Sequence, residues 1–343
     1  MKTHMENEIF EQANCLKKAY IYNKSIFEQI VNEIKSKRIK LVVFAARGSS
    51  DNSGVFFKYL CETLYQVPVS FAAASVITLY NSKIDYQDAL VIGVSQSGQA
   101  KDVLAVIDEA NEQKAMTITL TNYLDSPLAK AGKYHLFLNT GEEKSVAATK
   151  TYMTQMYLLG LLTGFISNNL DLINALRTVP EVLNLDDKIL DSINNLSIAH
   201  RNINSAFVLS RGYLYAIAKE LALKLQETTY IQALSYSIAD FYHGPFALVS
   251  KEAFCILLIP EDESFTDALK MLDDLNKVGA NCLLITSASE VSNKNTILLP
   301  KVSKFVAPFL YMFVSQYFCL NLALAKGLNP DKPRGLKKVT VTK

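Results

Sequence analysis

The chain alternates two kinds of segment along its length. Short, almost uninterrupted apolar runs recur, and between them lie longer stretches in which apolar residues return every three or four positions. Continuous apolar runs are typical of strands in a parallel sheet that helices cover on both faces, and the longer stretches are typical of amphipathic helices. The pattern therefore predicts an α/β fold.

The alternation occurs twice, so we expect two similar halves. A helix is predicted over 6–38, another over Thr149–Ile166, a helical connector over 167–200 and a last helix over Phe305–Lys326. The strands predicted in the first half are Leu41–Ala46, Val69–Ala73, Leu90–Val94, Met116–Leu120 and His135–Leu138. The strands predicted in the second half are Ala206–Leu209, Ile231–Gln232, Phe254–Ile259, Cys282–Thr286 and Thr296–Leu299. Each half is thus expected to hold a five-stranded parallel sheet between helices.

Two segments are apolar enough to raise the question of a membrane, Tyr152–Ile166 and Phe305–Leu320. Gly160 and several polar residues interrupt the first, and Pro308 interrupts the second, so neither reaches the ~18 uninterrupted apolar residues of a span. The acidic N-terminus lacks the basic-then-apolar layout of a signal peptide. We therefore expect no membrane contact, and interpret both segments as core or subunit-interface helices.

The composition narrows the class of protein. Half of the residues are apolar and a fifth are charged, which is typical of a compact chain. A net charge of +2 without a basic stripe argues against nucleic acid as a partner. The five cysteines include no C-x-x-C pair and are interpreted as reduced packing residues of a cytoplasmic protein. The four histidines include no pair at metal-ligand spacing, so no metal is expected.

Polar turns follow three of the predicted strands, at 47–50, 95–98 and 210–212. Such a turn leads into the N-terminus of the next helix, where free backbone N–H groups and the helix dipole favour a phosphate. Serine is also a common helix N-cap, which is the alternative interpretation of Ser95 and Ser97. Because Ser49 and Ser50 would converge on the same crevice, we favour a phosphate site. The turns hold no metal ligands, which indicates a small phosphorylated molecule bound without Mg²⁺.

A second candidate lies on the predicted helix Tyr215–Glu227. Glu220, Lys224 and Glu227 stand at i, i+4 and i+7 and so share one face, while apolar residues cover most of the remaining surface. Burying such charges is costly, and ionisable groups clustered in a cleft are candidates for acid–base chemistry. The alternative is an exposed, salt-bridged face.

Two further features are less specific when taken alone. His243 stands before Gly-Pro, in a turn that these two residues fix, and such a histidine taken alone is more often a surface or capping residue than a catalyst. The stretch 329–335 breaks any helix, and a basic tail that includes Lys338 follows. Such tails are usually solvated, but a docked lysine can close an anionic site.

Six segments in order along the chain resemble the sugar-isomerase (SIS) family. They are 47–54, 95–98 and 141–150 in the first half, and 220–227, 243–245 and 329–338 in the second half. The resemblance runs from about residue 40 to the C-terminus. It implies two SIS subdomains, each a three-layer α/β/α structure with a five-stranded parallel sheet. Within the family, the chain resembles the isomerase half of glutamine–fructose-6-phosphate aminotransferase and stand-alone glucosamine-6-phosphate deaminases.

The resemblance implies a role for particular residues. The phosphate-binding residues that it implies are Ser49, Ser95, Gln96 and Ser97. The sugar-binding residues that it implies are Gly48, Val146 and Ala148. The catalytic residues that it implies are Glu227 as proton shuttle, Lys224 and Glu220 as its charged neighbours, His243 for ring opening and Lys338 over the open-chain sugar. The family's histidine reaches in from a neighbouring subunit, so a homodimer is implied, and no metal or organic cofactor is required.

The chain departs from the aminotransferase pattern at two positions. Ala100 replaces a threonine that closes the phosphate loop, and Arg47 replaces a cysteine after the first strand. The sequence also shows no glutaminase domain and no N-terminal cysteine nucleophile, so we expect that the chain does not make ammonia from glutamine. The domains predicted are 1–38 (helical), 39–167 (first SIS domain), 168–200 (connector), 201–328 (second SIS domain) and 329–343 (a tail that closes the active site).

These features together predict an enzyme that releases ammonia from an amino-sugar phosphate. The expected reaction converts glucosamine 6-phosphate into fructose 6-phosphate by ring opening, proton transfer from C2 to C1 and hydrolysis of an imine. A fructosamine-6-phosphate deglycase and an aldose–ketose isomerase are alternatives with related chemistry. A sugar-phosphate sensor without catalysis is the alternative from another class, and the acidic N-terminal helix argues against the DNA-binding element that such regulators carry.

Overall fold

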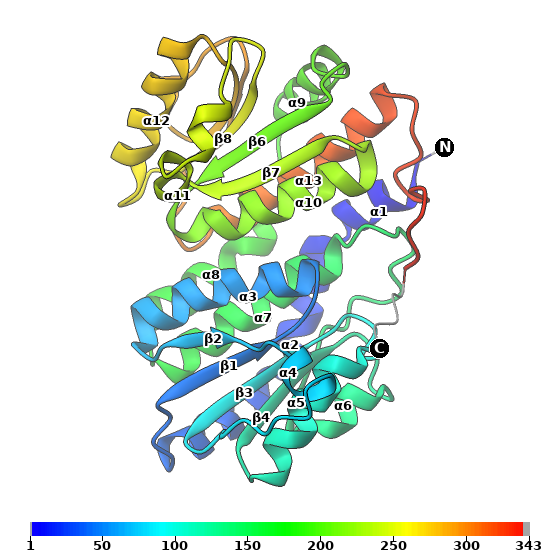
Figure 1. Cartoon of the computed structure of the whole chain (residues 1–343). Coiled ribbons are helices and arrows are strands. Elements are labelled where there is room, and N and C mark those ends of the chain that lie inside the picture. The colour runs from blue at the N-terminus through cyan, green and yellow to red at the C-terminus, as the bar shows by residue number, and fades with distance from the viewer. Residues whose placement is uncertain (1, 339–343) are drawn as a thin grey trace. The chain divides into compact units, whose positions relative to one another are not determined.

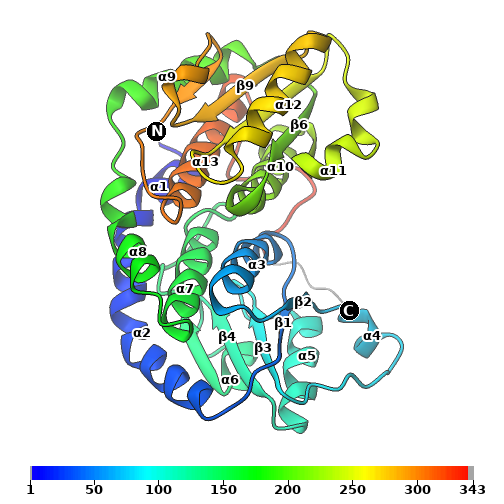
Figure 2. The ribbon, with the colours of Figure 1, turned by 90° about the vertical axis from the view of Figure 1, so that its left-hand side faces the viewer.

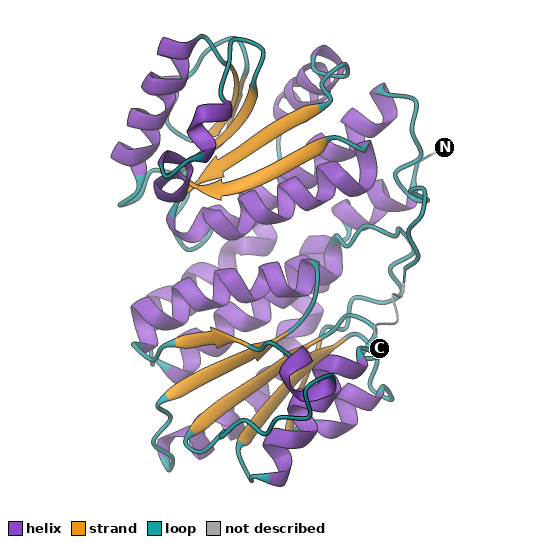
Figure 3. Cartoon of the chain, in the orientation of Figure 1, coloured by secondary structure: helices purple, strands orange, loops and turns teal. Residues whose placement is uncertain are grey.

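The computed structural model describes residues 2–338, and residues 339–343 of the predicted tail lie outside this range. The described chain contains two five-stranded sheets, in which the paired strands run parallel (Figures 1 and 3). Helices flank both sheets. The predicted α/β fold with two subdomains is therefore confirmed.

The chain forms two compact units that do not follow the order of the sequence. The first-sheet unit consists of Glu11–Glu143, Ala148–Pro180, Lys337 and Lys338. The second-sheet unit consists of 2–10, Lys144–Ala147 and Glu181–Leu336. The short piece Lys144–Ala147 thus belongs to the second-sheet unit, although the residues on both sides of it belong to the first.

The first sheet has the strand order β2-β1-β3-β4-β5. Its strands are β1 (Leu41–Ala45), β2 (Val69–Phe71), β3 (Ala89–Val94), β4 (Met116–Thr121) and β5 (Tyr134–Phe137). Around it lie α2 (Gln12–Lys35), α3 (Ser49–Leu60), the π-helical turn Cys61–Tyr65, α4 (Ser75–Thr78), α5 (Lys101–Glu112), α6 (Pro127–Ala131), α7 (Lys150–Ile166) and α8 (Leu170–Val182). Helices α2, α3 and α7 pack together, and α5 packs with α6 on the other face (Figure 2). The strand that follows β1 in the chain, β2, lies on one side of β1, whereas β3, β4 and β5 follow one another on the other side. The direction of winding therefore reverses between β1 and β3.

The second sheet repeats this arrangement, with the strand order β10-β9-β8-β6-β7. Its strands are β6 (Ser205–Ser210), β7 (Gln232–Ser237), β8 (Phe254–Ile259), β9 (Asn281–Thr286) and β10 (Thr296–Leu298). Its helices are α1 (His4–Phe10), α9 (Asp187–Ala199), α10 (Tyr215–Thr229), α11 (Ile238–Tyr242), α12 (Phe265–Val278) and α13 (Ala307–Ala325), with short 3₁₀ turns at Gly212–Leu214, Pro245–Leu248 and Ser289–Val291. Helix α13 packs against α1, α9 and α10, whereas α11 and α12 pack with the opposite face.

The single helix predicted over 6–38 is wrong, because the chain forms two helices that meet at Glu11. The apolar residues of the two helices belong to different cores. In α1, Phe10 packs edge-on against Phe313 and Tyr317, with ring centroids 5.7 Å apart in both cases, within the second-sheet unit. In α2, Phe27 stacks on Phe165 of α7 within the first-sheet unit. The periodicity alone did not reveal this change of partner.

Both apolar segments prove to be core helices. Every residue of α7 from Lys150 to Gly164 is buried, and a Cβ at Gly160 would lie 2.9 Å from the Leu176 side chain of α8. The glycine that interrupts the apolar run is therefore what lets α8 approach. Helix α13 is long and apolar enough to span a membrane by length and composition, but 83% of its most apolar window is buried within the chain.

The prediction for β7 is too short, whereas the prediction for the cysteines agrees with the structure. Strand β7 is longer than the predicted Ile231–Gln232, because it continues through Ser237 in register with β6. All five cysteines are buried and unbridged, as expected for packing residues. Burial raises the pKa of the Cys15 thiol to about 11.

Candidate active site

Two polar loops meet at the point where the winding of the first sheet reverses. Gly48 and Ser49 follow β1, and Ser95–Gly98 follow the neighbouring strand β3. In open parallel sheets, ligands bind outside the carboxyl ends of the strands at such a reversal. The topology therefore places the predicted phosphate residues at the same edge of the first sheet.

Two helix N-termini point backbone N–H groups into the same region. Helix α3 begins at Ser49, with Gly48 at the N-cap, and α5 begins at Lys101, with Ala100 at the N-cap. Neither N-cap residue accepts a side-chain hydrogen bond from its helix. The replacement of a threonine by Ala100 thus leaves the start of α5 without a side-chain cap, and an anionic ligand suits such a helix start.

The Ser95–Gly98 loop has a tightly determined backbone. Gly98 has φ +66°, a conformation that favours glycine, and its N–H donates to Ser95 Oγ over 3.2 Å. A Cβ at Gly98 would lie 2.1 Å from Ser126 Oγ. Ser95 is buried, whereas Gln96 and Ser97 are half-buried. The loop is held by the glycine so that its polar groups lie at the end of β3.

An ion pair ties the loop after β1 to the start of α5. Arg47 Nε lies 2.8 Å from a carboxylate oxygen of Asp102, in the first turn of α5. Asp102 is almost fully buried and Arg47 is half-exposed. Arg47 therefore braces the loop after β1 against the start of α5, a role that the sequence analysis missed.

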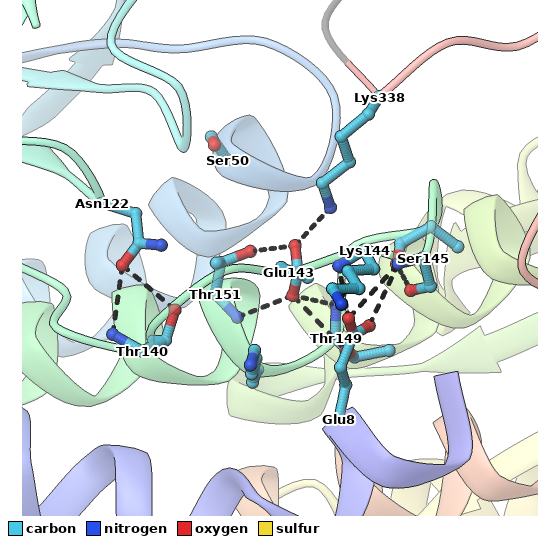
Figure 4. A network of polar contacts seen from close by, with 12 residues as sticks. Glu8, Ser50, Asn122, Thr140, Glu143, Lys144, Ser145, Thr149, Thr151 and Lys338 are labelled. Carbon is cyan, nitrogen blue, oxygen red and sulfur yellow. Dashed lines mark hydrogen bonds and ion pairs between the residues drawn. The ribbon is translucent and has the colours of Figure 1, made fainter. Parts of the chain in front are cut away.

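Glu143 is a buried carboxylate that the sequence analysis also missed. One oxygen accepts hydrogen bonds from the backbone N–H groups of Thr149 and Thr151, both at 3.0 Å, at the start of α7. The other oxygen accepts from Thr151 Oγ1 at 2.8 Å and pairs with Lys338 Nζ at 2.5 Å (Figure 4). The carboxylate thus caps α7 and holds the predicted tail lysine within the first-sheet unit.

These donors decide the charge of Glu143. Its complete burial would by itself raise the pKa, but Lys338 and the N–H groups of Thr149 and Thr151 outweigh burial and hold the pKa of Glu143 below its ordinary value. Glu143 therefore remains a carboxylate at neutral pH, and Lys338 has a permanent anionic partner.

The second-sheet unit carries the predicted charged face of α10. Lys224 Nζ lies 3.2 Å from Glu220 and contacts Glu227 more closely. Glu220 and Lys224 are fully buried, and the Glu227 side chain is 19% exposed. The alternative of an exposed, salt-bridged face is excluded. Glu227 is the member of the cluster that a ligand can reach.

The two carboxylates keep Lys224 charged. Burial would lower the pKa of this ammonium group, but Glu220 and Glu227 outweigh burial and raise the pKa well above its ordinary value. Lys224 therefore places a fixed positive charge beside Glu227. The arrangement suits a carboxylate that takes a proton and gives it back.

His243 lies apart from this cluster. It follows α11, its backbone N–H donates to Asp240 O, and its side chain is exposed. Gly244, with φ +131°, shapes the turn as predicted. The contribution of His243 across a subunit interface stays a prediction.

The remaining sugar-binding candidates are divided between the units. Gly48 and the half-buried Ala148 belong to the first-sheet unit, and the half-buried Val146 belongs to the second. Among the described residues, no group of three or more His, Cys, Asp or Glu side chains could hold a metal ion.

Comparisons with known proteins agree with this fold. The model of the SIS domain matches residues 34–163 and 200–326. A glutamine–fructose-6-phosphate aminotransferase (isomerizing) from Thermococcus kodakarensis is 29% identical over 350 residues, which cover 98% of this chain and 58% of that protein. The chain thus spans less than two thirds of this relative's length.

Solved structures extend the likeness over the full chain. The C-terminal domain of glucosamine-fructose-6-phosphate aminotransferase from Francisella tularensis has a TM-score of 0.86 and 25% identity, and the match covers 97% of this chain and 98% of that domain. Glucosamine-6-phosphate deaminase from Thermotoga maritima has a TM-score of 0.76 at 21% identity, with 99% and 100% coverage, and so shares the fold.

Replacing Gly98 with alanine should disrupt the loop after β3. The positive φ and the contact with Ser126 together should cost about 2–4 kcal/mol of unfolding free energy. Gly327→Ala is the matched control, because Gly327 has φ +72° and nothing within 4 Å of the added Cβ, so it should cost only about 1–2 kcal/mol. Urea unfolding measures both, and equal costs would show that Ser126 does not confine the loop.

Glu143→Gln should destabilise the chain in a pH-dependent way. The wild-type carboxylate has a lowered pKa, so its contribution is present above the ordinary value of 4.5 and is lost as the pH falls through the lower folded value. At pH 7 we expect a loss of about 2–3 kcal/mol, because the variant removes the ion pair and the charged acceptor.

The measurement is thermal or urea unfolding of both proteins between pH 7 and 3. The difference should stay constant down to about pH 5 and shrink below it. The exposed neighbour provides the control, since Glu142→Gln should change the unfolding free energy by less than about 0.5 kcal/mol. A difference that persists unchanged to pH 3 would contradict the assigned charge state of Glu143.

Proposed function

Because the chain belongs to the SIS domain family, as a phosphosugar isomerase-type protein related to the isomerase domain of glutamine–fructose-6-phosphate aminotransferase, we propose that it acts on an amino-sugar phosphate. The proposed reaction converts glucosamine 6-phosphate and water into fructose 6-phosphate and ammonia. The observation that carries this proposal is the buried Glu220–Lys224–Glu227 cluster, which has one carboxylate open to a ligand.

The phosphate of the substrate is proposed to bind at the loop after β3. Ser95, Gln96 and Ser97 supply hydroxyl and amide donors, and Ser49 supplies another beside the start of α3. A phosphate dianion is matched by several donors together with the positive ends of two helix dipoles. This site anchors one end of the sugar without a metal ion, so the binding energy can orient the other end.

The chemistry is proposed to occur at C1 and C2 of the open-chain sugar. Glu227 removes the C2 proton, the electron pair forms the C1–C2 double bond of an enolamine, and the C1 carbonyl oxygen takes up a proton as its double bond to carbon opens. Glu227 then returns its proton to C1, and the amine gives up a proton, which leaves an imine at C2 and a hydroxyl at C1. A single carboxylate can serve both carbons because they are adjacent, and Lys224 contacts this carboxylate directly. Water adds to the imine, the C–N bond breaks, and ammonia leaves.

Two further residues complete the proposed site. His243, from a second copy of the chain in a homodimer, is proposed to open the sugar ring. Its exposure and its position on a turn fixed by Gly244 fit a residue that serves another subunit. Lys338 is proposed to cover the open-chain sugar from the tail, where Glu143 holds it in the structure. No cofactor takes part in this scheme.

Aldose–ketose isomerisation is the second candidate function. It uses the same proton transfer between C1 and C2, and only the imine hydrolysis is missing. A fructosamine-6-phosphate deglycase would likewise use the same imine chemistry on a larger amine. A sensor without catalysis is disfavoured, because a non-catalytic pocket gains nothing from a buried charged cluster that is costly to form.

Incubation with glucosamine 6-phosphate should release ammonia and fructose 6-phosphate in equal amounts, as measured by coupled enzymatic assays. Glu227→Gln should lower turnover by about 100-fold or more, because the amide cannot carry the proton. The affinity for fructose 6-phosphate, measured by calorimetry, should change by less than about threefold, since the phosphate loop is intact.

The control is Glu290→Gln, an exposed glutamate of the same unit, which should retain full turnover. Near-normal turnover of Glu227→Gln would remove Glu227 from the proposed role. Ammonia released only from a fructosyl-amino-acid phosphate would favour the deglycase. Interconversion of glucose 6-phosphate and fructose 6-phosphate with no ammonia from glucosamine 6-phosphate would favour the isomerase.

A further inference from the structure

The segment Lys144–Ala147 is fastened to the N-terminal helix α1 by one side chain. The buried carboxylate of Glu8 accepts hydrogen bonds from the backbone N–H groups of Lys144 and Ser145, the latter at 3.3 Å (Figure 4). Ser145 Oγ in turn donates to Ala147 O at 2.8 Å. The residues around Val146 are therefore held in place by a side chain from a helix more than 130 positions earlier in the chain.

The same segment is held from a second direction by the C-terminal stretch. Val146 N–H donates to the backbone oxygen of Asp331 at 3.4 Å. The Asp331 carboxylate accepts from the N–H groups of His4 and Met5, at 2.9 and 2.8 Å, at the start of α1. Glu8 and Asp331 thus close a ring that joins α1, the Val146 segment and the stretch before the tail, all within the second-sheet unit.

This ring is anchored on the helix layer that carries the charged cluster. Met5 and Ile9 of α1 are fully buried, and Phe10 packs against two aromatic rings of α13. Helix α13 packs directly against α10, the helix of Glu220, Lys224 and Glu227. The Val146 segment is therefore part of the same packed unit as Glu227, although its chain neighbours on both sides belong to the first-sheet unit.

We propose that Glu8 and Asp331 are positioning residues that fix the Val146 segment on the unit that carries Glu227, so that the sugar is held at a set place relative to that carboxylate. The inference rests on the proposed function in one respect, namely that Val146 contacts the sugar. Neither side chain takes part in proton transfer. Loosening the segment weakens sugar binding in the ground state and the transition state alike, which raises KM and leaves kcat unchanged.

Amide hydrogen exchange of the full chain tests the fastening without any substrate. Glu8→Ala removes the acceptor of two amides, and exchange at Lys144 and Ser145 should accelerate by about tenfold or more. Asp331→Ala should accelerate exchange at His4 and Met5 by a similar factor. The control is Glu6→Ala, on the same short helix, which should leave exchange at Lys144 and Ser145 unchanged. Unchanged exchange in Glu8→Ala would overturn the proposal.

Steady-state kinetics tests the positioning. Glu8→Ala and Asp331→Ala should each raise KM for glucosamine 6-phosphate by about tenfold, with kcat within about twofold of wild type. Asp331→Asn should restore the wild-type KM, because asparagine also accepts hydrogen bonds at a helix start. Faster exchange with an unchanged KM, or a loss of kcat at constant KM, would overturn the positioning role. If Glu8→Ala does not fold, as judged by its thermal melt, the KM of Asp331→Ala decides whether the Val146 segment positions the sugar.

A failure of the proposed function can be distinguished from a failure of this inference. If the wild-type chain releases no ammonia, the dissociation constant of fructose 6-phosphate replaces KM, and a tenfold weakening in Glu8→Ala still supports the positioning role. If the wild-type chain binds no sugar phosphate, the positioning role fails together with the proposed function. The exchange of Lys144 and Ser145 still decides whether Glu8 fastens the segment.

Discussion

The ion cluster on α10 is the constraint around which the second-sheet unit is organised. Removing an ammonium group and two carboxylates from water costs several kcal/mol for each ion, and their mutual attraction offsets that cost only at short distances. Lys224 must therefore stay between Glu220 and Glu227. Most of the other buried residues of α10 are apolar, and they pack against the apolar helix α13. The packing of these two helices keeps water away from Glu220 and Lys224.

In the first-sheet unit, the constraint is the placement of hydrogen-bond donors for the proposed phosphate site. A phosphate needs donors that are already in place, and the reversal of winding between β1 and β3 supplies two helix starts side by side. Gly98 fixes the loop after β3, and the Arg47–Asp102 pair braces the loop after β1 against the start of α5. The two sheets share a topology, yet the proposed phosphate site lies on the first and the proposed proton-transfer carboxylate belongs to the unit of the second.

Much of this could be predicted from the sequence, because local patterns specify it. Apolar runs predicted the strands, and the polar turns predicted the loops that follow β1 and β3. The positions of Glu220, Lys224 and Glu227 on one face followed from helical spacing alone. The helix over 6–38 was predicted as one element, because its periodicity continues across Glu11 while its packing partners change. The pairs Glu143–Lys338 and Glu8–Ser145 join residues that lie far apart in the chain, and no local spacing encodes them.

The division of the chain has a consequence for how its parts can be separated. The backbone passes from one compact unit to the other after Phe10, Glu143, Ala147, Pro180 and Leu336. Cutting one peptide bond therefore never separates the two compact units. A fragment that ends at any one of these points lacks a segment that belongs to its own unit. An exchange of halves between related chains would have to transplant several separate pieces at once. Because the two units are interleaved in the sequence, neither can be separated from the other as one continuous segment, although their sheets are alike.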